Sequence, residues 1–314
     1  SIITSSIYND LKVRRLCEAG LNDFNAYKKN VLLKALGFNT SQTINLFNGQ
    51  QLQWLEKNET LGMDIARFFK QNNNSVVAKA FGKLAIEAWI AGGDVDFQNK
   101  IIKDSTFVGT KADCVYELLS STNNNLFKNV LSTFTNGKAQ FELKFRIGEV
   151  PDGADGSTTF DNNTGIITIT FPQIINAKSS IEIASIILHE GIHGELRRIY
   201  EGKNQVSEPL PNNQYEYLVD LWDYFRGISP PSKVSNNASH TYMVHNHVLP
   251  IANAVREFDN NTYGIDYYMW FGWQGLSDIG KITYPQLLTS SQETNYINLQ
   301  QIPINDSIKQ SCDE

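Results

Sequence analysis

Apolar and polar positions recur with a helical period through the N-terminal third of the chain. Apolar side chains return every three or four residues, as they do along one face of an amphipathic helix. Ser75 can cap the start of the last such segment, and Gly92 can end it. The pattern predicts helices at residues 8–19, 23–36, 50–57, 60–70 and 76–91.

The period changes in the middle of the chain. We expect a connection at residues 94–110, followed by helices at 112–119 and 124–135. Apolar and polar residues then alternate at positions 139–147, which predicts a half-buried strand with one solvent-exposed face. Its apolar positions are Phe141, Leu143, Phe145 and Ile147, and its polar positions are Glu142, Lys144 and Arg146. A second alternating stretch at residues 166–171 predicts another strand.

Residues 150–163, between the two strands, are rich in Gly, Asp and Thr and are predicted to form a loop. The loop contains Asp152, Asp155 and Asp161, which lack the spacing of a calcium-binding loop. We therefore interpret these three aspartates as turn formers.

Helical spacing returns towards the C-terminus. Residues 214–225 predict an aromatic helix, and residues 239–259 predict an amphipathic one that Pro250 should interrupt. The chain from Ser290 is polar and without a pattern. The whole predicts an α+β protein: a mainly helical N-terminal region at residues 1–104, followed by a domain at residues 105–314 with a small sheet.

The net charge and the composition limit the kinds of binding partner that we expect. The net charge of −6 argues against nucleic acid as the main partner. No stretch approaches the roughly 20 apolar residues of a membrane-spanning helix, and no signal peptide opens the chain. The first residue is serine, which suggests a processed product or an excised fragment. Cys17, Cys114 and Cys312 have no C-x-x-C spacing, so one disulfide is left open and no disulfide framework is indicated.

One stretch of the sequence contains a motif that indicates a catalytic or metal-binding function rather than only secondary structure. Residues 186–195 read IILHEGIHGE and contain the pattern His-Glu-x-x-His. On a helix, His189 and His193 lie one turn apart on the same face, so both imidazoles can bind one Zn²⁺ ion. Glu190 lies beside them and can take a proton from a zinc-bound water. A capping box at Ser179 and Glu182 predicts that this helix starts ahead of the motif.

This motif resembles that of the zincin metallopeptidases. In that family a strand beside the metal helix commonly borders the substrate cleft, and the resemblance gives this role to residues 166–171. A catalytic zinc site needs three protein ligands, and the metzincin extension is absent after His193. The remaining candidates are His240, His245, His247, Glu208, Glu216, Asp220 and Glu257. His240 and His247 lie on the apolar side of their predicted helix, whereas His245 points away from it.

A second resemblance favours His240. The motif, the run His240-x-Tyr242-Met243, the pair Tyr267-Tyr268 and the run Trp273-x-Gly275-Leu276 resemble zincin-like domains at the C-termini of large secreted or toxin-like bacterial proteins. This resemblance implies that His240 is the third ligand and that the protein is secreted or delivered out of a bacterial cell. The three tyrosines either stabilise an oxyanion or, as most tyrosines do, pack in the core.

The sequence therefore predicts zinc-dependent hydrolysis of peptide bonds, with a protein or peptide as substrate. Zinc is expected on His189, His193 and His240, and Glu190 is expected to be the catalytic base. Two alternatives stay open: a catalytically silent, zinc-bearing binding module, and an amidase that acts on non-protein substrates. The intact Glu190 argues against the binding module, because a binder needs no base beside its metal.

Overall fold

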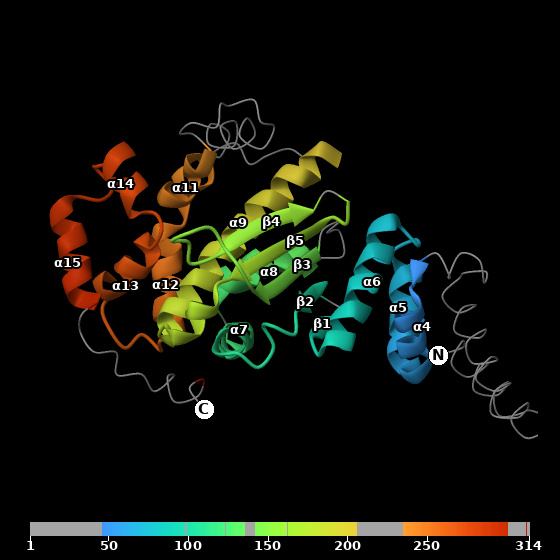
Figure 1. The fold of residues 1–314 in the computed structure, drawn as a ribbon. Coiled ribbons are helices and arrows are strands. Elements are labelled where there is room, and N and C mark those ends of the chain that lie inside the picture. The colour runs from blue at the N-terminus through green and yellow to red at the C-terminus, as the bar shows by residue number, and fades with distance from the viewer. Residues whose placement is uncertain are drawn as a thin grey trace, which may run out of the picture. The chain divides into compact units, whose positions relative to one another are not determined.

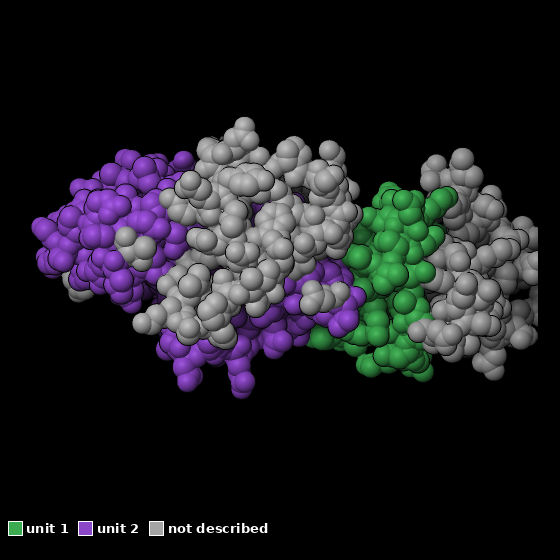
Figure 2. Space-filling model, turned by 90° about the horizontal axis from the view of Figure 1, so that it is seen from above, with its two compact units in different colours: residues 1–97 green, residues 98–314 purple. Residues whose placement is uncertain are grey.

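The computed structural model describes residues 46–97, 99–122, 124–135, 142–161, 163–205, 235–300 and 312. These residues form α-helices and a mixed β-sheet, so the predicted α+β class is confirmed (Figure 1). Contacts divide the chain into two compact units, Ser1–Phe97 and Gln98–Glu314 (Figure 2). This division precedes the predicted boundary at residue 104, because a strand at residues 101–103 pairs within the second unit.

The described part of unit 1, residues 46–97, is mainly helical, as predicted. Its elements are α4 (Gly49–Lys57), α5 (Glu59–Gln71), α6 (Val76–Ala91) and the short strand β1 (Asp94–Asp96). Ser75 caps α6 by accepting a hydrogen bond from the amide of Ala78 at 3.2 Å, and Gly92 ends it with a φ of 90°. Both caps are confirmed. The helices predicted at residues 8–19 and 23–36 lie outside the described residues.

The sheet of unit 2 contains, in spatial order, β2 (Ile101–Lys103), β3 (Glu142–Ile147), β5 (Ile166–Phe171) and β4 (Ser157–Asp161). β2 and β5 run parallel to β3, and β4 pairs antiparallel with β5. The connection predicted at 94–110 and the loop predicted at 150–163 are therefore wrong where β1, β2 and β4 lie. Strands this short contain too few alternating positions to be recognised from their own period.

The two predicted strands are confirmed as β3 and β5, although residues 139–141 of the first, with Phe141, lie outside the described residues. Leu143, Phe145 and Ile147 are buried, as the alternation predicts. The prediction that the polar face of β3 is exposed to solvent is wrong at Glu142, which is 1 % exposed. β3 is an inner strand with β2 along one edge and β5 along the other, and inner strands are covered more completely than a simple alternation assumes.

The helix α9 (Ser180–Gln205) lies at the centre of unit 2. It contacts strands β4 and β5 and four helices (Figure 1), namely α7 (Lys111–Ser121), α8 (Asn125–Thr135), α12 (Val248–Phe258) and α13 (Ile265–Trp273). The other helical elements are η1 (Gln173–Ala177), α11 (Ser235–Asn246), α14 (Ser277–Thr283) and α15 (Ser290–Gln300). Among the helices of the described ranges, none combines the length and the apolarity needed to cross a bilayer.

The C-terminal helices differ from the sequence pattern in two places. The interruption expected near Pro250 occurs at His247, between α11 and α12, and Pro250 lies in the first turn of α12, where proline is tolerated. The chain after Ser290 forms α15 despite its lack of a pattern, because Thr289 caps it and Tyr296 packs on the core. The aromatic helix predicted at residues 214–225 lies outside the described residues.

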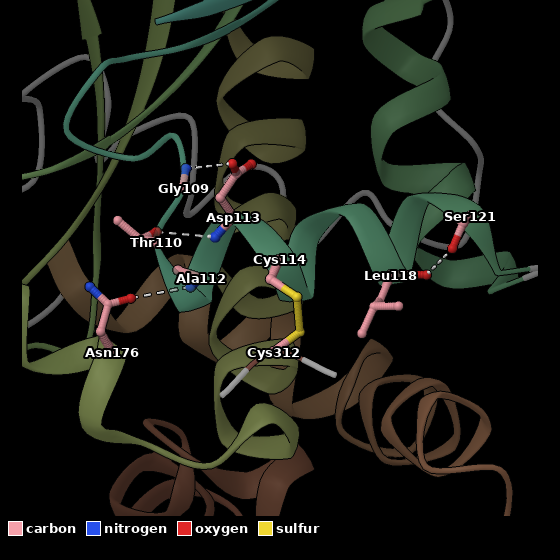
Figure 3. The surroundings of a disulfide bond; sticks show 9 residues. All are labelled: Gly109, Thr110, Ala112, Asp113, Cys114, Leu118, Ser121, Asn176 and Cys312. Atoms are coloured by element: carbon pink, nitrogen blue, oxygen red, sulfur yellow. Dashed lines mark hydrogen bonds between the residues drawn. A yellow bond between two sulfur atoms is a disulfide. The ribbon is translucent and has the colours of Figure 1, made fainter. Parts of the chain in front are cut away.

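One disulfide is present in unit 2. Cys114 of α7 is bonded to Cys312, with the two Cα atoms 5.6 Å apart (Figure 3). The bond joins residues that are 198 positions apart in the sequence. Thr110 caps α7 through the amide of Asp113 at 3.2 Å, which fixes the helix that carries Cys114 (Figure 3). The disulfide therefore attaches the C-terminal end of the chain to a helix that packs against α9.

Candidate metal centre

The His-Glu-x-x-His motif lies within α9. The predicted capping box is confirmed, because Ser179 Oγ accepts a hydrogen bond from the amide of Glu182 at 3.3 Å and Glu182 Oε2 accepts one from the amide of Ser179 at 2.9 Å. The helix continues without a break to Gln205. His189 and His193 therefore leave the same face of α9, one turn apart.

The structure brings His240 of α11 to these two histidines. His193 Nε2 lies 3.1 Å from His189 Nε2 and 3.2 Å from His240 Nε2. The three ring nitrogens lie within 4.8 Å of one another, and no second group of metal-binding side chains of this kind occurs in the described ranges. In a tetrahedral zinc site with Zn–N bonds of about 2.0–2.1 Å, ligand nitrogens are about 3.3–3.4 Å apart, so the spacing fits one shared ion.

Hydrogen bonding alone does not account for this cluster. Each imidazole nitrogen has either one proton to donate or one lone pair to accept with. His193 Nε2 has two nitrogen neighbours at hydrogen-bonding distance, so at most one of these contacts can be a hydrogen bond. In the other contact, two ring nitrogens that both carry a lone pair, or both carry a proton, face each other and repel. A cation shared by the three nitrogens removes that repulsion, and three imidazoles are a donor set that zinc accepts.

The three imidazoles are neutral at pH 7. Burial, together with the smaller effect of the neighbouring His240, lowers the pKa of His189 to about 3. Burial likewise holds the pKa of His193 well below its usual range and lowers the pKa of His240. Each ring can therefore offer a lone pair, which is what a metal ion requires.

Glu190 lies beside the histidines and is 6 % exposed. The hydroxyl of Thr158, on β4, donates a hydrogen bond to Glu190 Oε2 at 2.7 Å. Burial raises the pKa of Glu190 to about 7, the Thr158 bond opposes this rise, and Asp155 adds to it. Gly156 lies against the same side chain, because a Cβ atom at position 156 would be 2.6 Å from Glu190 Cγ. Residues on and just before β4 thus fix the carboxyl.

A small polar network connects the loop before β4 to the turn after α13. Asp155 Oδ1 lies 3.0 Å from Lys178 Nζ, and Asp155 Oδ2 accepts a hydrogen bond from Gln274 Nε2 at 2.9 Å. The next residue, Gly275, has a φ of 75° and lies against the ring of His189, since a Cβ there would be 3.3 Å from His189 Cε1. The network therefore supports both the carboxyl and one of the histidines from outside.

A cleft of about 600 Å³ lies over the histidines and Glu190. Residues 157–160 of β4 line it, and Arg197 of α9 lines it as well. The family resemblance gives the cleft-bordering role to residues 166–171, and this is wrong for the described cleft, which none of them lines. β5 is an inner strand, and its hairpin partner β4 takes the outer position beside the site.

The other two histidines do not belong to this cluster. The ring of His245 packs on Tyr284 with centroids 4.2 Å apart, and the ring of His247 lies 5.4 Å from that of Tyr242. Glu257 is exposed on α12. The remaining acidic candidates lie outside the described residues: Glu208, Glu216 and Asp220.

The tyrosines considered as oxyanion donors are buried and do not line the described cleft: Tyr242, Tyr267 and Tyr268. The hydroxyl of Tyr268 donates to Asp259 instead. The packing interpretation therefore fits them better. Asp161 accepts a hydrogen bond from the amide of Asn163 at 2.8 Å, so its interpretation as a turn former is confirmed.

Sequence reasoning missed the residues that surround Glu190. Thr158 and Gly156 lie in a segment that was predicted to be a loop. A signal was present, because the β-branched and aromatic residues 158–160 are followed by the turn residues 163–165 and then by a predicted strand. Arg197 was missed because it lies one turn beyond the recognised motif.

Comparison of the chain with protein-family models, with curated proteins and with solved structures gave no match.

Proposed function

We propose that this chain is a zinc-dependent peptidase with zinc held by His189, His193 and His240. The observation that carries the proposal is the convergence of three neutral imidazole nitrogens beside the buried carboxyl of Glu190, in a cleft. Three protein ligands leave a fourth position open, as in catalytic zinc sites. Bound zinc supplies Lewis acidity at a substrate carbonyl and lowers the pKa of water.

Glu190 is the general base and then the general acid. Its carboxyl takes a proton from the attacking water and returns it to the leaving amine. The hydroxyl of Thr158 already donates to Oε2 at 2.7 Å, which leaves Oε1 for this proton. The backbone of Gly156 lies so close to the same side chain that a Cβ atom would not fit between them, so the base is positioned before the substrate binds.

The shape of the cleft supports a peptide substrate. Residues 157–160 of β4 line it along one side, and β4 is the outermost strand at this end of the sheet. The backbone groups along such an edge can pair with an extended peptide. A peptide lying along β4 passes both Glu190 and the histidine cluster, which suits cleavage within a chain.

The disulfide supports action in an oxidising compartment. Structural disulfides persist in secreted and extracellular proteins and are rare in the cytosol. The bond between Cys114 and Cys312 therefore agrees with the secreted or delivered protein that the family resemblance implies.

Zinc content of matched histidine variants tests the metal site. The parent protein should retain about one zinc per chain after dialysis, and His240→Ala should lose it, because removal of one of three ligands weakens binding strongly. His245→Ala is the matched control, since its ring packs on Tyr284 instead. Circular dichroism checks that each variant is folded. Retention of full zinc by His240→Ala, or a folded parent without zinc, would overturn the proposed site.

A further inference from the structure

A glutamine in the wall of the cleft has one hydrogen-bonding atom in use and one without a partner. Gln274 follows the last residue of α13, is half-buried and lines the cleft. Its Nε2 donates a hydrogen bond to Asp155 Oδ2 at 2.9 Å. Its Oε1 is buried and has no hydrogen-bond partner among the described residues. Buried carbonyl oxygens without a donor are costly and rare in native proteins, so this one calls for an explanation.

The partner of Gln274 fixes the orientation of its amide group. An ionised carboxylate only accepts hydrogen bonds, and Asp155 also forms an ion pair with Lys178 at 3.0 Å. The NH₂ group of Gln274 must therefore face Asp155, and the atom that remains is an acceptor. Its missing partner is an N–H or O–H donor.

Gln274 lies directly beside the proposed zinc ligands and base. The next residue is Gly275, where a Cβ atom would be 3.3 Å from His189 Cε1. The loop that carries Asp155 lies against Glu190 in the same way. Neighbouring Cα atoms are about 3.8 Å apart, and an extended peptide advances by about 3.3 Å per residue. A substrate group that binds to Gln274 therefore belongs to a residue within about two positions of the scissile bond.

An extended peptide brings a donor of the required kind at each residue. β4 lines the cleft, and in a peptide paired with its edge the backbone groups of alternate residues point towards β4 and away from it. The N–H groups that point away need acceptors elsewhere in the cleft. The turn after α13 also lines the cleft and offers Gln274 Oε1.

We propose that Gln274 Oε1 accepts a hydrogen bond from a backbone nitrogen of the peptide substrate, near the scissile bond. The last torsion of a glutamine side chain is soft, so a modest rotation turns the oxygen towards an arriving donor. Oε1 gives up no hydrogen bond in this movement, because it has none among the described residues. The donor is either an internal N–H group or the terminal amine of the peptide. This inference rests on the proposed peptidase function.

Backbone esters test this hydrogen bond. The zinc-loaded protein is incubated with a mixed decapeptide library, and its fastest substrate is synthesised again with one amide at a time replaced by an ester, which lacks the N–H group. The scissile amide is left unchanged. We expect kcat/KM to fall about tenfold for an ester near the scissile bond, which is the effect of one hydrogen bond. If only acetylation of the N-terminus has this effect, the donor is the terminal amine. Insensitivity to both changes overturns the proposal.

The variant Gln274→Ala assigns the sensitive position to this residue. Its kcat/KM for the parent peptide should fall about tenfold, and the change at the sensitive position should cause no further loss, because the acceptor is already absent. A merely structural role of Gln274 would leave that sensitivity in place, and this result contradicts the assignment. Gln53→Ala is the matched control, since Gln53 is exposed on α4. Thermal unfolding and zinc content are measured for each variant, and Gln274→Met, which is close in volume, replaces an alanine variant that does not fold.

A binding measurement separates the role of Gln274 from the peptidase function. Zinc-loaded Glu190→Gln is immobilised, and the peptides that it retains from the same library are identified by mass spectrometry and synthesised again with esters. Weaker retention of one ester peptide, lost when Gln274→Ala is added, supports the role of Gln274 even if the parent cleaves nothing, in which case only the peptidase proposal fails. Cleavage without sensitivity to an ester or to acetylation leaves the peptidase and removes the role of Gln274. Neither cleavage nor retention removes both.

Discussion

The substitution Gly156→Ala tests how the carboxyl of Glu190, the proposed catalytic base, is positioned. A Cβ atom at this position would lie 2.6 Å from Glu190 Cγ, 2.8 Å from Cδ and 2.9 Å from Oε1. Ordinary carbon–carbon contacts are about 3.5–4.0 Å, so the two side chains must separate by about 1 Å. The groups in the way belong to a side chain rather than to the backbone, and Glu190 can move.

The expected effects on stability and activity are therefore very different. Movement of Glu190 breaks its hydrogen bond with Thr158, which costs about 1–3 kcal/mol of the free energy of unfolding. The proposed ligands His189 and His193 keep their places on α9, so zinc binding should remain. A misplacement of about 1 Å in a catalytic group lowers turnover by about 100-fold. We expect a folded, zinc-loaded variant with little peptidase activity.

The assay measures zinc content, denaturant unfolding and peptide hydrolysis for the same preparation. Gly264→Ala is the matched control, because no atom of the described residues, its chain neighbours aside, lies within 4 Å of the Cβ position and the backbone φ of −66° suits alanine. The control should keep both zinc and activity. Full turnover by Gly156→Ala would refute the argument that the loop before β4 positions Glu190. Loss of zinc by this variant would show that the loop acts on the histidines instead.

Two further predictions concern stability. The disulfide joins residues 198 positions apart, so its loss in Cys114→Ser should lower the free energy of unfolding by about 2–5 kcal/mol. Denaturant titration with and without reductant measures this change, and an unchanged unfolding midpoint contradicts it. Burial raises the pKa of Glu142 from 4.5 to about 9, although Lys100 opposes the rise, and the folded state therefore loses stability as pH rises through this range. At pH 9 the free energy of unfolding of Glu142→Gln should exceed that of the parent by about 1–3 kcal/mol, and at pH 4 the variant should show no gain. Equal stability of the two proteins at pH 9 would show that Glu142 is solvated.

Helix positions could be predicted from the sequence wherever a period and a cap coincided. Val76–Ala91 has both, with Ser75 before it and Gly92 after it, and its bounds agree with the prediction. The capping box of Ser179 and Glu182 placed the start of α9 equally well. Local rules suffice in such segments, because helical hydrogen bonds and caps join residues that are close in the sequence.

Elements that depend on distant partners could not be predicted in this way. β4 exists because it pairs with β5, and β2 because it pairs with β3, so neither needs a strong period of its own. α15 is polar, yet it contacts α13 and begins at a good cap. The burial of Glu142 follows from the strand order, which the alternation in β3 does not contain.

In the candidate site, too, the residues set by local sequence could be predicted and those set by distant contacts could not. His189, Glu190 and His193 lie in one helical turn, so their common face follows from the sequence. The inward position of His240 was inferred from an apolar stripe and a family resemblance, and the structure brings it to 3.2 Å from His193. The contacts of Thr158 and Gly156 with Glu190 depend on where β4 lies beside α9, which no local pattern contains.

Hydrolysis by Glu190→Gln at equal zinc content tests the peptidase proposal most directly. The substitution removes the base but no metal ligand, so the variant should bind zinc like the parent. We expect the zinc-loaded parent to cleave a mixed peptide library and the variant to cleave it at least about 100-fold more slowly. Hydrolysis by the variant at the parent rate, or a zinc-loaded parent that cleaves no peptide, would contradict the proposal.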